Sequence, residues 1–402
     1  MSTRNRTRCA IVSMVVIGFT IAARGTLDAA GSSNSTVSSS AVSAPTASAL
    51  QAALDDFVES SGSPGGVVAV SVGGAEPIVV TSGLADRRTG APMPDDPLFY
   101  TGKIGDQFVT AVALQLVAEG ALGLDDAVAT YLPDAPHAAE LTVRHLLSHT
   151  SGFQDWIVGR DELTNALWER VEADPSRRFT SDEMIDLMRD RPLRFTPGSR
   201  ALHSEFNVLL LRLIIEQVTG KEFGGVLADR VLSPIGLPRT AYGLDAVPHS
   251  DLLPGQVRQP GDPADRWTTD VDDAAYVTSF YSAAPIASSV SDLMHWGDAL
   301  YRTSEVVPTA IADEASEVNE FGSALLGIAL TEDGVCVMLV NCSAGSHDYV
   351  GFGQPSLARG AFSGLFYHQP LDAVIFVLVN NTGPSIRPLY AAVRQTLGDP
   401  EH

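Results

Sequence analysis

The chain has 402 residues, 45% of them hydrophobic, which is enough for one large domain or for a domain with a substantial insertion. Its formal net charge of -22 argues against nucleic acid and anionic membrane surfaces as partners, because both are themselves negatively charged. We interpret this acidic balance as that of a soluble protein surface.

The N-terminus has the pattern of a secretory signal. A basic segment at residues 4–8 precedes a short apolar run at 10–23, after which small residues follow. We therefore predict a signal peptide over 1–30 and a flexible Ser/Ala/Thr-rich linker over 31–48. The apolar run is short for a membrane-spanning helix, so we expect secretion, with an uncleaved N-terminal anchor as the alternative. No transmembrane segment is predicted beyond this signal.

Two cysteines follow the signal, Cys336 and Cys342. Cys336 lies in a strand-like run, and straight strand would separate the two cysteines by roughly 20 Å. A disulfide needs Cα atoms within about 7 Å of each other, so pairing would require a turn between them. We expect buried, unpaired thiols.

The predicted elements begin with a helix near Leu50 and a hairpin whose strands, 67–72 and 78–81, meet across Gly73-Gly74. An apolar helix over about 105–119 follows, and capping signals at Thr142 and Thr180 start further helices. The predicted elements that remain are a helix at 208–218, strands at 324–330, 335–340, 361–367 and 373–379, and a final helix at 384–397.

This order predicts an α+β fold, in which an antiparallel sheet is flanked by helices and built from strands at both ends of the chain. We expect one domain over 49–400, with a helical subdomain inserted at roughly 110–290.

Several stretches carry a family resemblance. The most specific is Leu-Thr-Val-Arg-His-Leu-Leu-Ser-His-Thr-Ser-Gly at 141–152. Further landmarks follow in matching order at 120–126, 131–133, 195–198, 210–220, 288–293 and 377–380. Together they resemble the serine β-lactamase and D-alanyl-D-alanine carboxypeptidase (penicillin-binding) family, closest to its class C-like and esterase branch. The resemblance implies a β-lactamase/transpeptidase-like fold over roughly 50–398.

The family's chemistry implies three motifs. These are a Ser-x-x-Lys pair at the start of the buried helix, a Tyr-x-Asn on a loop, and a Lys- or His-x-Gly on an edge strand. The landmarks put Lys103 at the nucleophile and Asp106 at the helix lysine. His203 and Glu205 take the places of the tyrosine and the asparagine.

The third motif falls on Pro355 and Ser356, within 355–357. A one-residue slip would place Gln354 there instead, and 351–353 offers another register. Neither register supplies the expected Lys or His.

The lysine count shows that the first motif is missing in every register. The chain contains two lysines, Lys103 and Lys221, and the residues three positions before them are Tyr100 and Val218. No Ser-x-x-Lys therefore exists in the sequence.

Three hypotheses follow. The first is a secreted pseudoenzyme that acts as a binding or regulatory module in the cell envelope, with a small molecule, a peptidoglycan fragment or a protein at its cleft. The second is a repurposed site in which Lys103, Asp106, His203 and Glu205 perform acid-base chemistry. We predict no cofactor and assign no metal ligands; within the second hypothesis, Asp106, His203 and Glu205 could form a metal site.

The third hypothesis is residual hydrolysis by another serine: Ser151, Ser204 or Ser356. His145 and His149 lie in the most specific landmark, where the resemblance implies no catalytic role. We expect both to hold their helix in place through buried hydrogen bonds.

Overall fold

A computed structural model describes residues 46–156, 162–257, 268–270, 274–280, 285–303, 305–317, 323–325, 327–331, 334–335, 349–358, 360–381 and 385–398. The predicted signal peptide, linker residues 31–45, Cys336 and Cys342 lie outside these ranges, as does most of the predicted strand 335–340.

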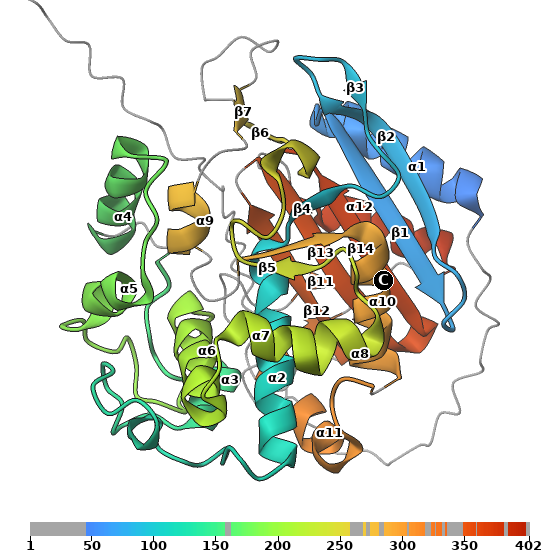
Figure 1. Cartoon of the computed structure of the whole chain (residues 1–402). Helices are drawn as coiled ribbons and strands as arrows, with labels where there is room; N and C mark the ends of the chain where they lie inside the picture. Colours follow the sequence, from blue (N-terminus) through green and yellow to red (C-terminus); the bar gives the residue numbers. More distant parts are fainter. Residues whose placement is uncertain are drawn as a thin grey trace, which may run out of the picture.

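The centre of the molecule is an antiparallel sheet that joins the two ends of the chain (Figure 1). β1 (Gly65–Val72) pairs with β2 (Ile78–Asp86) on one side and with β14 (Ala373–Val379) on the other. The described strands follow the order β11-β10-β12-β13-β14-β1-β2-β3, and β9 also pairs with β10. The other strands are β3 (Ala91–Pro92), β9 (Ser323–Ala324), β10 (Gly327–Thr331), β11 (Gly334–Val335), β12 (Tyr349–Ala358) and β13 (Ala361–His368).

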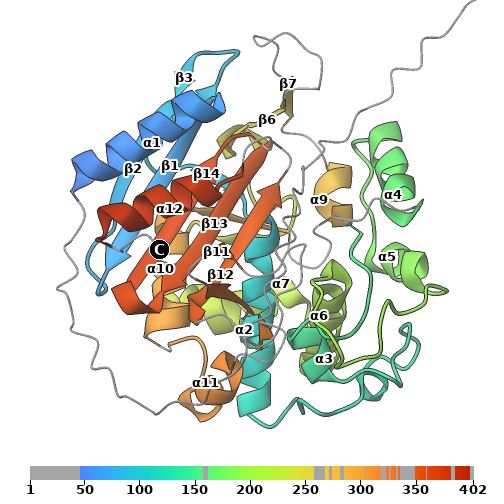
Figure 2. The same cartoon turned by 180° about the vertical axis from the view of Figure 1, so that it is seen from behind.

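Helices bury both faces of this sheet. Figure 2 shows α1 (Ala47–Ser61) and α12 (Arg387–Thr396) lying across one face, where Leu50, Ile375 and Leu389 belong to a single apolar cluster. A larger cluster fills the opposite side, beneath α2 (Asp106–Ala118) and α10 (Val290–Gly297). Burial on both faces explains why β14 is apolar at every position. The predicted α+β fold class is confirmed.

The middle of the chain is mostly helical. The side chains of Thr142 and Thr180 cap α3 and α5 in capping boxes, and Gly220 ends α6 in the left-handed conformation. Among the described helices, none is both long and apolar enough to span a membrane. The helices are α3 (Val143–Leu147), α4 (Glu162–Ala173), α5 (Ser181–Met188), α6 (Glu205–Thr219), α7 (Phe223–Leu227), α8 (Ser233–Ile235), α9 (Ala274–Phe280) and α11 (Thr309–Ser316).

Two small sheets accompany these helices. One has the order β4-β8-β5, and the other pairs β6 with β7. Their strands are β4 (Leu98–Tyr100), β5 (Ala241–Tyr242), β6 (Gly255–Val257), β7 (Thr268–Asp270) and β8 (Ile286–Ser289). The first sheet leads directly into the start of α2, because β4 ends at Tyr100.

Three local features differ from the sequence-based expectations. Lys103 lies in a 3₁₀ turn, η1 (Gly102–Gly105), that runs into α2. Glu205 is the first residue of α6 and not part of an extended loop, because Ser204 already caps the helix. The domain begins slightly before residue 49, since α1 starts at Ala47.

β12 is only partly an edge strand. β10 pairs with its first half, from Tyr349 to Gly353, whereas β13 pairs with residues 351–358 and so reaches into both halves. Pro355 and Ser356 lie in the second half, opposite Gly364 and Ser363 of β13. Among the described strands, this second half pairs on one side only, which suits a proline because proline has no N–H for a ladder hydrogen bond.

Candidate functional site

The start of α2 places Lys103 and Asp106 at one buried point. In a 3₁₀ turn, side chains three residues apart lie nearly above one another, so the two point the same way. The turn is anchored by Thr101, whose hydroxyl donates a hydrogen bond to the carbonyl of Ile286 at 3.0 Å. Lys103 has no exposed surface, and Asp106 is 5% exposed.

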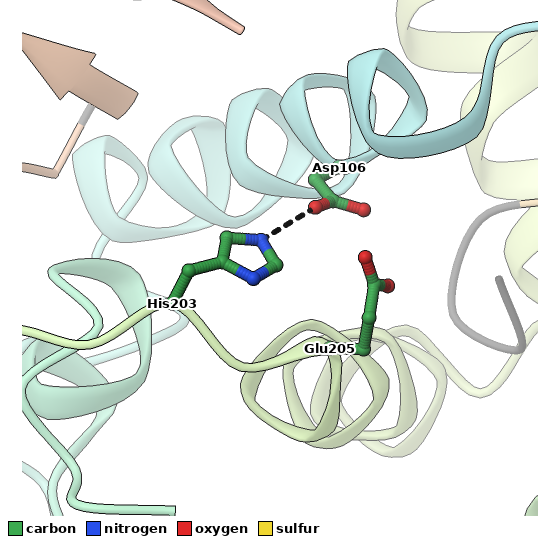
Figure 3. A group of neighbouring side chains, drawn as sticks. All are labelled: Asp106, His203 and Glu205. Atoms are coloured by element: carbon green, nitrogen blue, oxygen red, sulfur yellow. Dashed lines mark hydrogen bonds and ion pairs between the residues drawn. The ribbon is translucent and has the colours of Figure 1, made fainter. Parts of the chain in front are cut away.

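The start of α6 supplies the second half of the site. The hydroxyl of Ser204 accepts a hydrogen bond from the backbone N–H of Phe206 at 3.3 Å and donates one to the carbonyl of Gln154 at 3.1 Å. These bonds fix the helix start, and the flanking side chains of His203 and Glu205 are buried toward α2. Figure 3 shows His203 and Glu205 both directed at Asp106.

A buried polar network connects all four predicted residues. Lys103 Nζ lies 2.9 Å from His203 Nδ1 and 3.1 Å from Asp155 Oδ2. His203 Nδ1 is 3.0 Å from the same Asp155 oxygen, and His203 Nε2 is 3.2 Å from Asp106 Oδ2. Glu205 Oε1 lies 3.8 Å from Lys103 Nζ. The structure therefore brings Lys103, Asp106, His203 and Glu205 together, as the placement on the family motifs predicts.

Asp155 belongs to this network, and the sequence analysis did not identify it. It is buried and lies in the segment that follows the 141–152 landmark, between Phe153 and α4. No periodicity marks such a position. The one available signal is that a lysine in a buried turn requires a nearby anion, and Asp155 is an acidic residue close to a landmark.

Burial and neighbouring charges together raise the pKa values of Glu205, Asp106 and Lys103. Burial raises the pKa of Glu205 well above its usual range, and the Asp106 charge raises it further. Burial also raises the pKa of Asp106, despite the hydrogen bond from His203. Burial lowers the pKa of Lys103, but the charges of Asp155, Glu205 and Asp106 outweigh it and leave this pKa raised. This raised pKa favours the ammonium form of Lys103 over a nucleophilic amine.

The two landmark histidines are structural, as predicted, although both are half-buried. His145 Nδ1 accepts a hydrogen bond from the backbone N–H of Thr142 at 3.2 Å and completes the α3 capping box. His149 Nδ1 accepts one from the side-chain amide of Asn207 at 3.1 Å, and its ring stacks on His203 with centroids 4.4 Å apart. Burial lowers the pKa of His149 well below its usual value, so this ring is neutral.

Two of the three alternative serines make structural hydrogen bonds. Ser151 donates to Asn207 Oδ1 at 2.6 Å and accepts from the backbone N–H of Phe153 at 3.1 Å. Ser204 caps α6, as described above. The third, Ser356, lies on β12, the strand that packs against η1.

Replacing Ser204 with alanine tests its structural role. We expect Ser204→Ala to destabilise the fold by about 0.5–2 kcal/mol, because α6 loses its N-cap. Urea unfolding followed by circular dichroism measures this loss. We expect no change in reactivity toward esters; an ester hydrolysis that disappears in Ser204→Ala would instead identify Ser204 as a nucleophile.

Comparison with known proteins identifies the family of the chain. A family model described as Beta-lactamase matches residues 50–394. The chain belongs to the beta-lactamase family. Esterase EstB of Burkholderia gladioli is 32% identical over 190 residues, which cover 44% of this chain and 47% of the esterase. A D-aminopeptidase of Brucella anthropi is 33% identical over 193 residues, covering 48% of this chain and 35% of that enzyme. The chain thus spans less than half the length of these beta-lactamase-family relatives.

Solved structures of the family share the fold. The D-amino acid amidase of Ochrobactrum anthropi SV3, in complex with D-phenylalanine, has a TM-score of 0.70 and is 21% identical. The match covers 88% of this chain and 98% of the amidase. The β-lactamase/transpeptidase-like architecture predicted from the landmarks is therefore confirmed.

Proposed function

We propose that this chain is an extracytoplasmic beta-lactamase-family protein that has lost serine acyl transfer and works as a binding or regulatory module in the cell envelope. The observation that carries the proposal is the environment of Lys103. It occupies the position that the resemblance assigns to the nucleophile, it has no exposed surface, and Asp155 and His203 contact its ammonium group.

The chemistry of this position supports the loss of turnover. A charged ammonium has no lone pair with which to attack a carbonyl. Acyl transfer to a neutral amine would give an amide, which does not turn over as an ester does. The chain contains no Ser-x-x-Lys. Neither the serine nor the lysine of the family mechanism is therefore present at the start of this helix.

The replacements also disfavour the family's usual ligands. Glu205 puts a carboxyl group where the resemblance implies a neutral amide, and Pro355 provides no positive charge where it implies Lys or His. A substrate carboxylate, such as that of a penicillin, would lose a cation and gain a repulsive neighbour wherever Glu205 is ionised.

Relatives of the chain suggest the kind of ligand. Those named above are an esterase and a D-aminopeptidase, and others are named penicillin-binding proteins. The candidate ligands are a small molecule, a peptidoglycan fragment or a protein. The predicted signal peptide supports an extracytoplasmic location.

Covalent labelling tests the proposal. We expect the mature chain to show no labelling by a fluorescent penicillin and no turnover of a series of chromogenic esters, while an active penicillin-binding protein tested in parallel is labelled. Labelling or ester turnover that disappears in Ser356→Ala or Ser151→Ala would overturn the loss of serine chemistry.

A second candidate function is a repurposed acid-base site. The residue types favour it, because random decay would often put small or apolar residues at these positions, whereas Lys103, Asp106, His203 and Glu205 are all ionisable. Their burial favours the binding role over this one. An activity of any class that persists in Ser356→Ala but is lost in His203→Asn would support the repurposed site.

A further inference from the structure

Asp106, His203 and Glu205 form a set of side chains with the geometry of metal ligands. One ligand atom from each lies within 4.8 Å of the other two, and all three side chains are buried. Figure 3 shows the imidazole and both carboxylates directed at one another from two different elements. Asp106 comes from α2, whereas His203 and Glu205 flank the N-cap of α6.

Glu205 provides an independent indication that a ligand is missing. Glu205 is fully buried, and neither oxygen of its carboxyl group has a hydrogen-bond partner among the described residues. The nearest cation, Lys103 Nζ, is 3.8 Å away, which is an ion-pair distance but too long for a hydrogen bond. A buried carboxyl group without hydrogen bonds is costly, so a cation at this point would satisfy an unmet requirement.

His203 has a carboxylate beside the ring nitrogen that does not face the other two ligands. Its Nδ1 lies 3.0 Å from Asp155 Oδ2 and 2.9 Å from Lys103 Nζ, and its Nε2 lies 3.2 Å from Asp106 Oδ2. Metal-bound histidines characteristically donate their second ring N–H to a carboxylate, which fixes the tautomer and the ring orientation. With a metal on Nε2, the Nδ1–H would donate to Asp155, and Lys103 would direct its N–H groups to Asp155 and Glu205 instead of to Nδ1. Asp155 would then act as a positioning residue and not as a ligand.

The distances suit a small tetrahedral ion. Ligand atoms about 2.0–2.2 Å from Zn²⁺ at tetrahedral angles lie about 3.3–3.5 Å apart. His203 Nε2 and Asp106 Oδ2 are already 3.2 Å apart, and no hydrogen bond prevents the Glu205 carboxylate from closing on them. An imidazole nitrogen among the ligands favours Zn²⁺ over Mg²⁺ and Ca²⁺, which prefer oxygen.

We propose that Asp106, His203 and Glu205 bind one Zn²⁺ ion per chain, with Asp155 orienting the histidine. The site lies beside Lys103, at the position of the family's nucleophile helix. This inference goes beyond the proposed function, because the loss of serine chemistry holds whether or not metal binds. Bound Zn²⁺ would join α2 to α6 and stabilise the folded state, since the unfolded chain holds no assembled site.

Calorimetric titration of the full chain tests the site. After treatment with EDTA and desalting, the wild-type chain is expected to bind one Zn²⁺ and to show a higher Tm with Zn²⁺ than without. Glu205→Gln and Asp106→Asn are each expected to weaken Zn²⁺ binding at least about 10-fold. Both keep the side-chain shape and remove a buried charge, so we expect them to fold, as circular dichroism would show.

The matched control is Glu119→Gln. Glu119 lies at the other end of α2 and pairs with Arg230 at the surface, so its loss should leave Zn²⁺ affinity unchanged. Zinc-edge X-ray absorption of the loaded wild-type chain should require nitrogen and oxygen ligands.

Three results would overturn the proposal. These are an absence of saturable Zn²⁺ binding by the wild-type chain, an affinity that Glu205→Gln and Asp106→Asn leave unchanged, and an absorption spectrum that requires sulfur. The last result would assign the metal to the cysteines instead.

Discussion

Lys103→Met is expected to destabilise the protein by about 3–5 kcal/mol at pH 7, because it leaves buried carboxylates without their cation. Methionine keeps most of the length and apolar volume of the lysine stem, so the loss reports the charge and not a cavity. The side chains of Lys103, Asp155 and Glu205 are at most 2% exposed, so water cannot replace the missing ammonium. Urea unfolding in the presence of EDTA measures the change.

The chain contains a matched control, because its other lysine is at the surface. Lys221 pairs with Asp229 at 2.9 Å, and both side chains are more than 60% exposed. Lys221→Met should therefore change the free energy of unfolding by about 1 kcal/mol at most. Similar effects for the two substitutions would contradict the assignment of Lys103 to a buried charge network.

A double variant isolates the coupling. If Lys103 stabilises the carboxyl group of Glu205, adding Glu205→Gln to Lys103→Met should recover part of the lost stability. Additive effects of the two substitutions would mean that the 3.8 Å ion pair contributes little and that Asp155 accounts for most of the effect.

The sequence predicted the secondary-structure elements well where a strong local signal marks them. The helix at Leu50 and the hairpin across Gly73-Gly74 appear at their predicted places, as do the capped starts of α3 and α5. Each depends on local signals: an apolar stripe, paired glycines, or a threonine three residues before a side chain that completes a capping box. β12 was predicted only as a motif position, because Gly351, Gly353 and Pro355 interrupt the apolar alternation that marks a strand.

The site was predicted by a different route. Lys103 is 100 residues from His203 along the chain, and no periodic pattern relates Lys103 and Asp106 to His203 and Glu205. Their convergence followed from placing each on a family motif, so it depended on the landmarks around them and not on the residues themselves. Asp155 matches no motif of the family, and it became visible only once the segment after the 141–152 landmark was placed against Lys103.

The contacts of Lys103 show how this site differs from a serine active site. A serine nucleophile must contact its substrate, whereas Lys103 makes its contacts with Asp155 and His203 inside the protein. The replacements form one connected polar network, in which Lys103 faces the carboxyl groups of Asp155 and Glu205. Removing one member of such a buried network costs more than removing an exposed charge, so the altered residues depend on one another for stability.

Glu205→Gln is expected to stabilise the metal-free protein by about 1–3 kcal/mol at alkaline pH, because it removes a buried charge that lacks hydrogen bonds. Burial raises the pKa of Glu205 well above its usual value of 4.5. Between the unfolded-state and folded-state pKa values, the folded state therefore binds more protons than the unfolded state. Stability must then fall as the pH rises through this range.

Glutamine does not titrate, so the Glu205→Gln variant should not lose stability in this way as the pH rises. The stability difference between Glu205→Gln and the wild type should be small near pH 5 and should grow toward pH 9, as measured by urea unfolding in EDTA. Glu119→Gln is a control whose pH dependence should have the opposite sign. The hydrogen bond from Arg230 lowers the pKa of that exposed carboxyl group, so its ionised form stabilises the folded state. Its effect should be small, since exposed pairs are screened by water. A Glu205→Gln difference that stays constant from pH 5 to pH 9 would mean that this carboxyl group binds the same number of protons in the folded and unfolded states, so that its pKa is not raised by burial.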